Sequence, residues 1–289
     1  MTPEATERLN EFFAKFAGGA RPLLLLDYDG TLAPFRVDRF TARPWAGVRE
    51  LLARIQRQGQ TRMAVVTGRP AAEIAPLLGL DPPLEVWGLH GAERLYSDGR
   101  RELEHAPAST QAKLEELRGF LRRDSLGGLF EDKANGVVMH WRGVSRSKAR
   151  QIEQRTRALF EPLARMEGLA LLEFEAGLEL RVGRNKGGAV EAIMAESGAG
   201  VGGLANCPVA FLGDDLSDEA AFQAVRRIGQ RGLSVLVRRE WRPTAAEVWL
   251  RPPGELKTFL KRWIESEDRF TRTLSCAATP GDTSRRTPE

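Results

Sequence analysis

The chain has 289 residues, enough for one large domain or two domains of modest size. Its 42% hydrophobic and 28% charged residues exclude wholesale disorder, and no apolar run reaches the roughly 18 residues of a membrane span. The net charge of +4 comes from scattered basic residues, which gives no reason to expect a nucleic-acid partner, and two distant cysteines exclude a disulfide framework.

The first ninety residues alternate between helix-like and strand-like segments. After an amphipathic helix, short apolar runs that would be covered on both faces are separated by helical patterns. The expected segments are helices over 4–16, 48–58 and 71–78 and strands over 22–26, 63–66 and 84–87. This alternation predicts a parallel sheet with crossover helices.

The pattern changes in the middle of the chain. Two long helical patterns, over 109–123 and 147–165, are each followed by a pair of strand-like runs. The runs cover 129–133 and 136–142, then 171–175 and 178–182, with turns predicted at Ala134–Gly136 and Ala176–Gly177. We expect an α+β unit inserted into the first domain.

The first pattern then resumes. Helices are expected over 186–195, 218–228 and 254–265, and strands over 209–212, 234–237 and 248–250. The expected fold is therefore α/β, a Rossmann-like parallel-sheet core in two parts, 1–103 and 184–267, with the α+β unit at 104–183. The polar segment 268–289 is expected to be a flexible tail.

Polar residues follow three of the apolar runs. The first run leads into Asp27-Tyr28-Asp29-Gly30-Thr31, the second into Thr67-Gly68-Arg69, and the third into Gly213-Asp214-Asp215 with Asp218 close behind. Ligands of open α/β sheets bind at the carboxyl ends of the strands, so these groups should converge. Carboxylates gathered this closely need a cation, and a set of oxygen ligands with little histidine favours Mg²⁺.

A cation among carboxylates and backbone N–H groups is suited to phosphoryl transfer. The sequence contains no Gx4GK[ST] motif, which argues against a P-loop nucleotide site. It also lacks a Ser-His-Asp elbow and a CxxxxxR loop. The nucleophile is then a carboxylate or a metal-bound water, and an aspartate would form an acyl-phosphate that water can hydrolyse.

Four motifs in order resemble those of the haloacid dehalogenase superfamily. They are DYDGT at 27–31, TGR at 67–69, Lys186 in NKGGAV, and GDDLSDE at 213–219. Together with GLHGAE, FEDK and GLELRVGRNKGGAV, they are similar to trehalose-6-phosphate phosphatases over roughly residues 22–260. Two departures, Val182 where the family often has proline and Ser217 where it commonly has threonine, touch no proposed catalytic group.

The resemblance implies a role for each motif residue. Asp27 would attack phosphorus, and Asp29 would protonate the leaving oxygen and later deprotonate water. Asp27, the Asp29 carbonyl, Asp214 and, nearby, Asp218 would hold Mg²⁺, whereas Asp215 is expected to be structural. The phosphate would be bound by Thr67, Gly68, Arg69 and Lys186.

The inserted unit would be a cap that closes over the site, with hinges near 99–107 and 182–185. Glu131 and Lys133 share a strand face, as do Glu179 and Arg181, and such pairs offer fixed donors and acceptors to sugar hydroxyls. In the resembled family, the positions of Glu131, Lys133, Arg142 and Glu179 contact the disaccharide, and His90 and Gly91 would lie near the sugar or the hinge.

Other interpretations stay open at this point. The charged residues of the inserted unit could be a solvated face of its sheet. The substrate could be the phosphate of sucrose, glucosylglycerate or mannosylglycerate, and a sugar-phosphate sensor without turnover is a further alternative. MTPEATERLN has no apolar core, so no signal peptide is expected, and we expect a cytoplasmic monomer without membrane contact.

Overall fold

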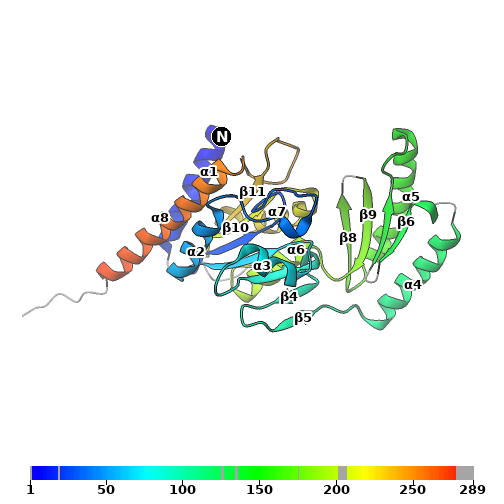
Figure 1. Cartoon of the computed structure of the whole chain (residues 1–289), viewed down its shortest axis with the longest axis horizontal. Coiled ribbons are helices and arrows are strands. Elements are labelled where there is room, and N and C mark those ends of the chain that lie inside the picture. Colours follow the sequence, from blue (N-terminus) through cyan, green and yellow to red (C-terminus); the bar gives the residue numbers. More distant parts are fainter. Residues whose placement is uncertain are drawn as a thin grey trace, which may run out of the picture.

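The computed structural model describes residues 2–18, 20–124, 127–133, 136–174, 176–200 and 207–277. The described strands form two separate sheets, one of eight strands in the order β12-β11-β10-β1-β2-β3-β4-β5 and one of four in the order β6-β7-β9-β8 (Figure 1). The expected α/β fold with a mainly parallel core sheet is confirmed. None of the described helices combines the length and apolarity that a membrane crossing needs.

Six neighbouring strands of the large sheet are parallel, with β1 at the centre. They are β1 (Leu23–Leu26), β2 (Arg62–Val66), β3 (Glu85–Gly88), β10 (Val209–Gly213), β11 (Gly232–Val237) and β12 (Val248–Leu250). The four leucines of β1 alternate between the two layers of the core: Leu24 and Leu26 pack in one, Leu23 and Leu25 in the other. This is why an unbroken apolar run is stable here.

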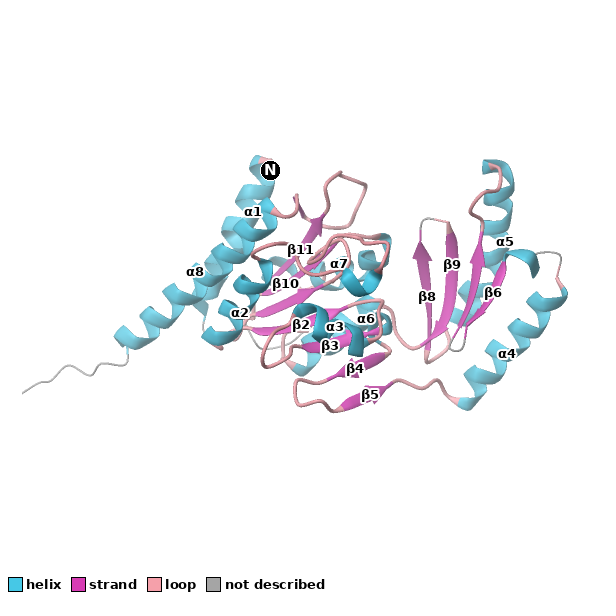
Figure 2. Cartoon of the chain, in the orientation of Figure 1, coloured by secondary structure: helices cyan, strands magenta, loops and turns pink. Residues whose placement is uncertain are grey.

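Helices cover both faces of this sheet (Figure 2). One face carries α1 (Pro3–Ala14), α2 (Val48–Gln58), α3 (Ala71–Leu78) and α8 (Gly254–Ala277), and the other carries α6 (Lys186–Glu196) and α7 (Glu219–Arg226). The bounds of α2 and α3 agree with the sequence prediction. Because β1, β2 and β10 are parallel, the polar segments that follow them lie along the same edge of the sheet.

Two core strands have no counterpart in the sequence prediction. They are β4 (Glu93–Leu95), which pairs antiparallel with β3, and β5 (Arg101–Leu103), which pairs antiparallel with β4. Each is three residues long and β5 is exposed throughout, so neither shows an apolar alternation that a pattern could detect. Gly99, which we placed near a hinge, lies in the turn between them with a positive φ of 88°.

The inserted unit is a four-stranded antiparallel sheet backed by two helices. It contains α4 (Ala108–Arg123), β6 (Phe130–Lys133), β7 (Gly136–His140), α5 (Arg146–Ala164), β8 (Leu169–Phe174) and β9 (Gly177–Val182). Leu178 and Leu180 of β9 pack under the helices, so Glu179 and Arg181 lie on the opposite face, which is turned toward the core (Figure 1). The predicted turn residues Ala134 and Asn135 are outside the described residues.

The prediction of a flexible tail from Asp268 was wrong for the part of that segment that the structure describes. Helix α8 continues to Ala277. Its buried face runs through Phe259 and Trp263 to Glu267, and Asp268 accepts hydrogen bonds from Gln58 and Arg54 of α2. The polar composition of this segment predicted a tail, but hydrogen bonds to α2 and the burial of the Glu267 side chain stabilise a helix instead.

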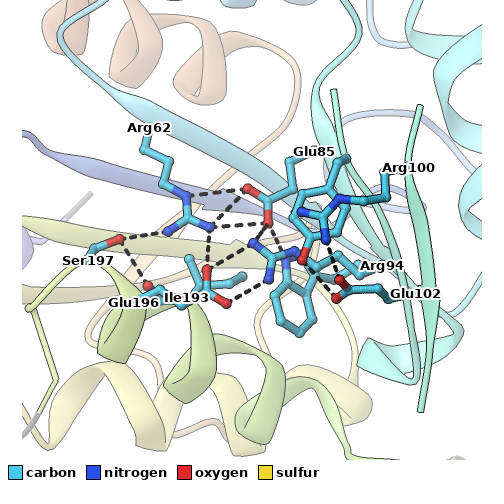
Figure 3. A network of polar contacts seen from close by, with 10 residues as sticks. Arg62, Glu85, Arg94, Arg100, Glu102, Ile193, Glu196 and Ser197 are labelled. Atoms are coloured by element: carbon cyan, nitrogen blue, oxygen red, sulfur yellow. Dashed lines mark hydrogen bonds and ion pairs between the residues drawn. The ribbon is translucent and has the colours of Figure 1, made fainter. Parts of the chain in front are cut away.

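A network of ion pairs ties the far end of α6 to the sheet (Figure 3). Arg62 of β2 and Arg94 of β4 each bind both Glu85 of β3 and Glu196 near the end of α6. Arg62 also donates to Ser197, at 2.9 Å. Because the same helix begins with Lys186, this network fixes the orientation of the helix that carries a predicted site residue.

Glu267 is a buried acid far from the predicted site, and it makes stability depend on pH. Its side chain is 1% exposed and accepts a hydrogen bond from Thr61, whose hydroxyl also accepts from Trp263. Burial raises the pKa of Glu267 from 4.5 to about 7, with the Thr61 hydrogen bond opposing the shift. Folding therefore favours the protonated acid, and stability is lost as the pH rises from 4.5 toward 7.

We expect Glu267→Gln, which keeps the acceptor for Thr61 but cannot ionise, to unfold at higher urea concentration than the parent protein at pH 8. The difference in the free energy of unfolding should be about 2–3 kcal/mol there and shrink toward zero near pH 5. Glu265→Gln, at an exposed position of the same helix, is the control. Equal effects of Glu267→Gln at both pH values would contradict the assignment.

Candidate active site

Three carboxylates from two neighbouring strand ends form a buried cluster. Asp27 follows β1, Asp214 follows β10, and Asp218 closes the 3₁₀ turn Leu216–Asp218. Strands β1 and β10 are paired in parallel, so their carboxyl ends coincide, and Asp27 N–H donates to the carbonyl of Leu212 at 2.8 Å. One oxygen from each acid lies within 4.8 Å of the others. Of the three strand ends expected to converge, those after β1 and β10 therefore bring their acids together.

Lys186 provides the positive charge of this cluster. Its ammonium donates to Asp27 Oδ1 and to Asp218 Oδ1, both at 2.7 Å, and its side chain is only 4% exposed. The residue starts α6, where Asn185 caps the helix by accepting from Gly188 N–H. A lysine at a helix start opposes the helix dipole, so the two carboxylates are what make this position favourable.

The charges in the cluster shift each other's pKa values. Burial raises the pKa of Asp27 to about 7, although the charge of Lys186 acts in the opposite direction. Burial and the neighbouring charges of Asp27 and Asp218 raise the pKa of Asp214 further, to about 10. Burial by itself would lower the pKa of Lys186, but Asp218 and Asp27 raise it overall. The lysine is thus charged, and the acids hold more negative charge than it offsets.

The donor set fits a hard divalent cation. Both oxygens of Asp218 are already occupied, one by Lys186 and the other by the N–H groups of Asp214 and Asp215. The carboxylate of Asp214, by contrast, accepts no hydrogen bond from any described residue. Gly30 makes room for it, since a Cβ there would lie 2.0 Å from Asp214 Oδ2. Asp27 and Asp214 can therefore ligate a cation, with Asp218 orienting the loop beneath.

Asp29 is not part of this cluster. Arg69 holds its carboxylate through a pair of hydrogen bonds, from Nε to Oδ2 at 2.6 Å and from Nη2 to Oδ1 at 2.5 Å. The remaining Arg69 nitrogen donates to the carbonyl of Arg39. The hydrogen bond and charge of Asp29 raise the pKa of Arg69 above its ordinary value. The two predicted site residues are thus bound to each other.

The segment after β2 packs against a strained turn after β3. Thr67 is buried, and its carbonyl accepts from His90 N–H at 2.7 Å. A Cβ at Gly68 would lie 2.7 Å from His90 Nε2, so only glycine fits there. Leu89 and His90 both have positive φ, 50° and 59°, and Gly91 has 104°. Strain of this kind in consecutive residues concentrates at functional sites.

His90 itself is kept neutral. Burial lowers its pKa well below the ordinary value, and the positive charges of Lys186, Arg181 and Lys133 lower it further. Two of these three cations belong to the inserted unit. The inserted sheet and the core site are therefore close enough at this point to interact electrostatically.

The inserted sheet brings together most of the predicted sugar-contacting residues. Lys133 donates to Glu179 Oε2 at 3.2 Å, and Glu131 pairs with His140 at 2.8 Å. These contacts lie on the face turned toward the core. Arg142 differs, because it lies exposed beyond the end of β7 and no contact among the described residues joins it to the others.

Sequence reasoning missed three features of this region. It did not give His140 a site role, it did not pair Asp29 with Arg69, and it left Arg181 out of the site. The shared face of Glu179 and Arg181 was visible in the two-residue spacing. The Asp29–Arg69 pair was not, because it joins two strand ends whose separation depends on the loops that follow them.

Comparison with known proteins agrees with this geometry. The family model described as trehalose-phosphatase matches residues 25–250. The trehalose-phosphate phosphatase of Mycolicibacterium paratuberculosis is 31% identical over 278 residues, which cover 92% of this chain and 68% of that protein. That of Mycobacterium avium is 30% identical over 276 residues, with the same two coverages.

Solved structures show the same fold. A trehalose-6-phosphate phosphatase structure from Aspergillus fumigatus has a TM-score of 0.70 at 23% identity, covering 90% of this chain and 97% of that one. A haloacid dehalogenase-like hydrolase from B. subtilis has a TM-score of 0.57 at 17% identity, covering 83% and 98%. The Rossmann-like core of the haloacid dehalogenase type with its inserted unit is therefore shared with these proteins.

The acidic cluster predicts a specific response to divalent cations. Mg²⁺ should raise the thermal midpoint of the parent protein by several degrees, since a ligand at 100 times its dissociation constant adds about 2.7 kcal/mol of stability. Asp214→Asn should remove that response and should itself be more stable than the parent without metal, because the cost of burying an acid whose pKa is raised to about 10 is gone. Differential scanning fluorimetry with Mg²⁺ or EDTA measures both effects.

Asp215→Asn is the matched control, one residue away and outside the cluster. It should keep the Mg²⁺ response, since asparagine retains the side-chain oxygen that caps the 3₁₀ turn. A Mg²⁺ response that persists in Asp214→Asn, or that is lost in Asp215→Asn, would show that the cation binds outside this cluster.

Proposed function

The chain belongs to the trehalose-phosphatase family and is a phosphatase, and we propose that it hydrolyses trehalose 6-phosphate to trehalose and phosphate through a phosphorylated Asp27. The observation that carries the chemistry is the buried Asp27, held at 2.7 Å by Lys186 beside a second, unbonded carboxylate on Asp214. The family relatives supply the substrate, since their names state trehalose phosphate.

The first step would be attack by Asp27. Its Oδ2 would form a bond to phosphorus while the bond between phosphorus and the sugar 6-oxygen breaks, and Asp29 would give its proton to the departing oxygen. Thr31 donates to Oδ2 at 3.1 Å and Lys186 to Oδ1, so the nucleophile is oriented on both sides before substrate arrives. Fixed orientation of this kind lowers the entropic part of the barrier.

The second step would regenerate the enzyme. A water molecule would give a proton to Asp29 and attack phosphorus, and the acyl-phosphate bond to Asp27 would break, which releases phosphate. Thr67, Gly68, Arg69 and Lys186 would bind the phosphoryl oxygens in both steps. Because Lys186 stays charged and buried, it offsets negative charge on the phosphoryl group at low dielectric.

We propose that the cation is Mg²⁺ and that Asp27, Asp214 and the Asp29 carbonyl would hold it, with Asp218 behind them; the clustering of Asp27, Asp214 and Asp218 supports this. When bound, it would neutralise phosphoryl charge and the excess charge of the acids. The raised pKa values of Asp27 and Asp214 mean that these residues bind protons in competition with the cation, so its apparent affinity should increase with pH.

Asp29 must leave Arg69 before it can act on the substrate. In the described geometry, both carboxylate oxygens of Asp29 accept hydrogen bonds from Arg69, so neither is available to donate a proton to the substrate. A phosphate group arriving at Thr67–Arg69 would compete for the same guanidinium and free Asp29. The proposed phosphate-binding role of Arg69 and its observed pairing are thus two states of one residue.

The cap would contribute the sugar contacts. Glu131, Lys133 and Glu179 lie on the sheet face turned toward the core, and the charge of Lys133 acts on His90, next to Gly91 in the core. Arg142 would join these contacts only after movement of the segment beyond β7. The alternative substrates, phosphates of sucrose, glucosylglycerate or mannosylglycerate, would use the same core chemistry and differ only at this face.

A substrate panel tests the proposal. With Mg²⁺, phosphate release should show a kcat/KM for trehalose 6-phosphate at least about tenfold above those for glucose 6-phosphate, sucrose 6-phosphate, glucosylglycerate phosphate and mannosylglycerate phosphate. The physical reason is that only the matching disaccharide satisfies all the donors and acceptors of the cap. A higher kcat/KM for any other compound replaces trehalose 6-phosphate as substrate, and no turnover of any compound favours a sensor.

Variants of Asp27 and Asp29 should lose activity in different ways. With p-nitrophenyl phosphate, whose leaving group needs no proton, Asp29→Asn should release about one equivalent of nitrophenol in a burst and then stall as the phosphorylated protein. Asp27→Asn should give no burst and lower kcat by roughly 10³-fold or more. Rapid mixing with absorbance detection and intact mass measure these outcomes. A burst from Asp27→Asn would place the nucleophile elsewhere.

A further inference from the structure

Arg181 is a buried cation whose donors are mostly unused. It lies in β9 with 4% of its surface exposed. Its Nε and Nη2 atoms have no hydrogen-bond partner within the part of the chain that the structure describes. Burial lowers its pKa, which means that the fold holds this charge at a cost. An arginine kept in this condition requires an explanation that packing does not provide.

The fold makes room for this side chain. In the sheet register, Arg181 lies between Gly136 of β7 and Ala170 of β8, the two smallest residue types. A Cβ at Gly136 would come within 2.9 Å of Arg181 Cβ and 2.7 Å of the Leu180 carbonyl oxygen, so a larger residue would not fit. Small residues on both neighbouring strands thus accommodate Arg181 in the sheet.

Only one side of the guanidinium has a partner. Its Nη1 is 4.0 Å from Glu179 Oε1, a weak contact, and Glu179 is shared with Lys133. The unused donors Nε and Nη2 lie on one edge of the planar group, with parallel N–H bonds. That edge suits two acceptor oxygens on adjacent atoms, such as a pair of neighbouring hydroxyls.

A second unpaired polar atom lies across the gap, on the core. His90 Nδ1 is buried without a hydrogen-bond partner among the described residues, and the strained turn holds its ring against Gly68. The positive charges of Arg181 and Lys133 act on this ring and lower its pKa, and the ring itself lies beside Gly68 of the segment Thr67–Arg69.

We propose that Arg181 and His90 form a subsite for the sugar ring that carries the phosphate, with the Nε–Nη2 edge of Arg181 donating to two neighbouring ring hydroxyls. This inference rests on the proposed function and extends it to a residue outside the predicted site. The hydroxyls are favoured over the phosphoryl group because the core already offers that group Lys186, Thr67 and a cation. A sugar ring on the far side of Gly68 would meet Arg181 and His90 together.

Kinetics with two kinds of substrate test the subsite. Arg181→Met should lower kcat/KM for trehalose 6-phosphate about 10- to 100-fold, mainly through KM, because two hydrogen bonds to a charged donor are lost. With p-nitrophenyl phosphate, which has no ring hydroxyls, kcat/KM should change less than about threefold. Arg181→Lys, which keeps the charge but not the paired donors, should resemble Arg181→Met.

Thermal stability distinguishes a binding role of Arg181 from a structural one, because the two roles predict opposite changes in the thermal midpoint of Arg181→Met. Because the guanidinium is buried without enough partners, Arg181→Met should leave the thermal midpoint unchanged or raise it. Arg150→Met, at an exposed position of α5, is the matched control and should change neither kinetics nor the midpoint. A fall in the midpoint of several degrees with both substrates affected equally would make Arg181 a structural residue.

His90→Asn examines the other half of the subsite, since asparagine tolerates the left-handed backbone. The decrease in kcat/KM for trehalose 6-phosphate that His90→Asn causes should be smaller in the Arg181→Met background than in the parent. An equal loss of activity toward p-nitrophenyl phosphate in Arg181→Met would instead assign Arg181 to the phosphoryl group and overturn the sugar subsite. If the parent protein itself did not prefer trehalose 6-phosphate, the proposed function would fail, which is a separate outcome.

Discussion

The buried ammonium of Lys186 between Asp27 and Asp218 is the interaction on which the site depends. Without it, three carboxylates could not be gathered in so small a buried space, because the cost of removing like charges from water rises steeply with proximity. One lysine does not neutralise three acids. The remaining negative charge suits the cluster to a cation, whereas the charge of Lys186 opposes the rise in the pKa of Asp27 that burial causes.

The parallel sheet supplies this arrangement with little help from the loops. Pairing of β1 with β10 places Asp27 and Asp214 one residue apart in register just beyond the strand ends, and α6, which packs on one face of the sheet, carries Lys186. The ion-pair network at the far end of α6 then limits how that helix can rotate (Figure 3). Catalytic geometry is thus a consequence of rigid elements, with Gly30 leaving space for Asp214.

The features that the sequence predicts correctly follow from the same parallel-sheet arrangement. Apolar runs ending in Asp27, Thr67 and Asp214 identify both the strands and the edge at which their ends meet. The hairpin β4–β5 could not be predicted because its strands are short and show no apolar alternation, and the end of α8 could not because its hydrogen-bond partners on α2 are distant in sequence. The Asp29–Arg69 pair was hidden for a related reason: the motifs specify which residues are present but not which of two partners a side chain holds.

Lys186 and Arg181 are two buried cations with different roles: Lys186 serves the chemistry, and Arg181 serves the substrate specificity of the protein. Lys186 has its partners within the fold and is ready before any substrate arrives. Arg181 and His90 have atoms without partners among the described residues, and Arg181 lies on the inserted sheet whereas His90 lies in the turn after β3 of the core. A ligand that supplied both would lower the free energy of the arrangement in which the two sheets face each other closely, so recognition of the sugar would itself stabilise closure. Substrates without the matching hydroxyls would leave these donors unpaired and the closed arrangement unfavourable.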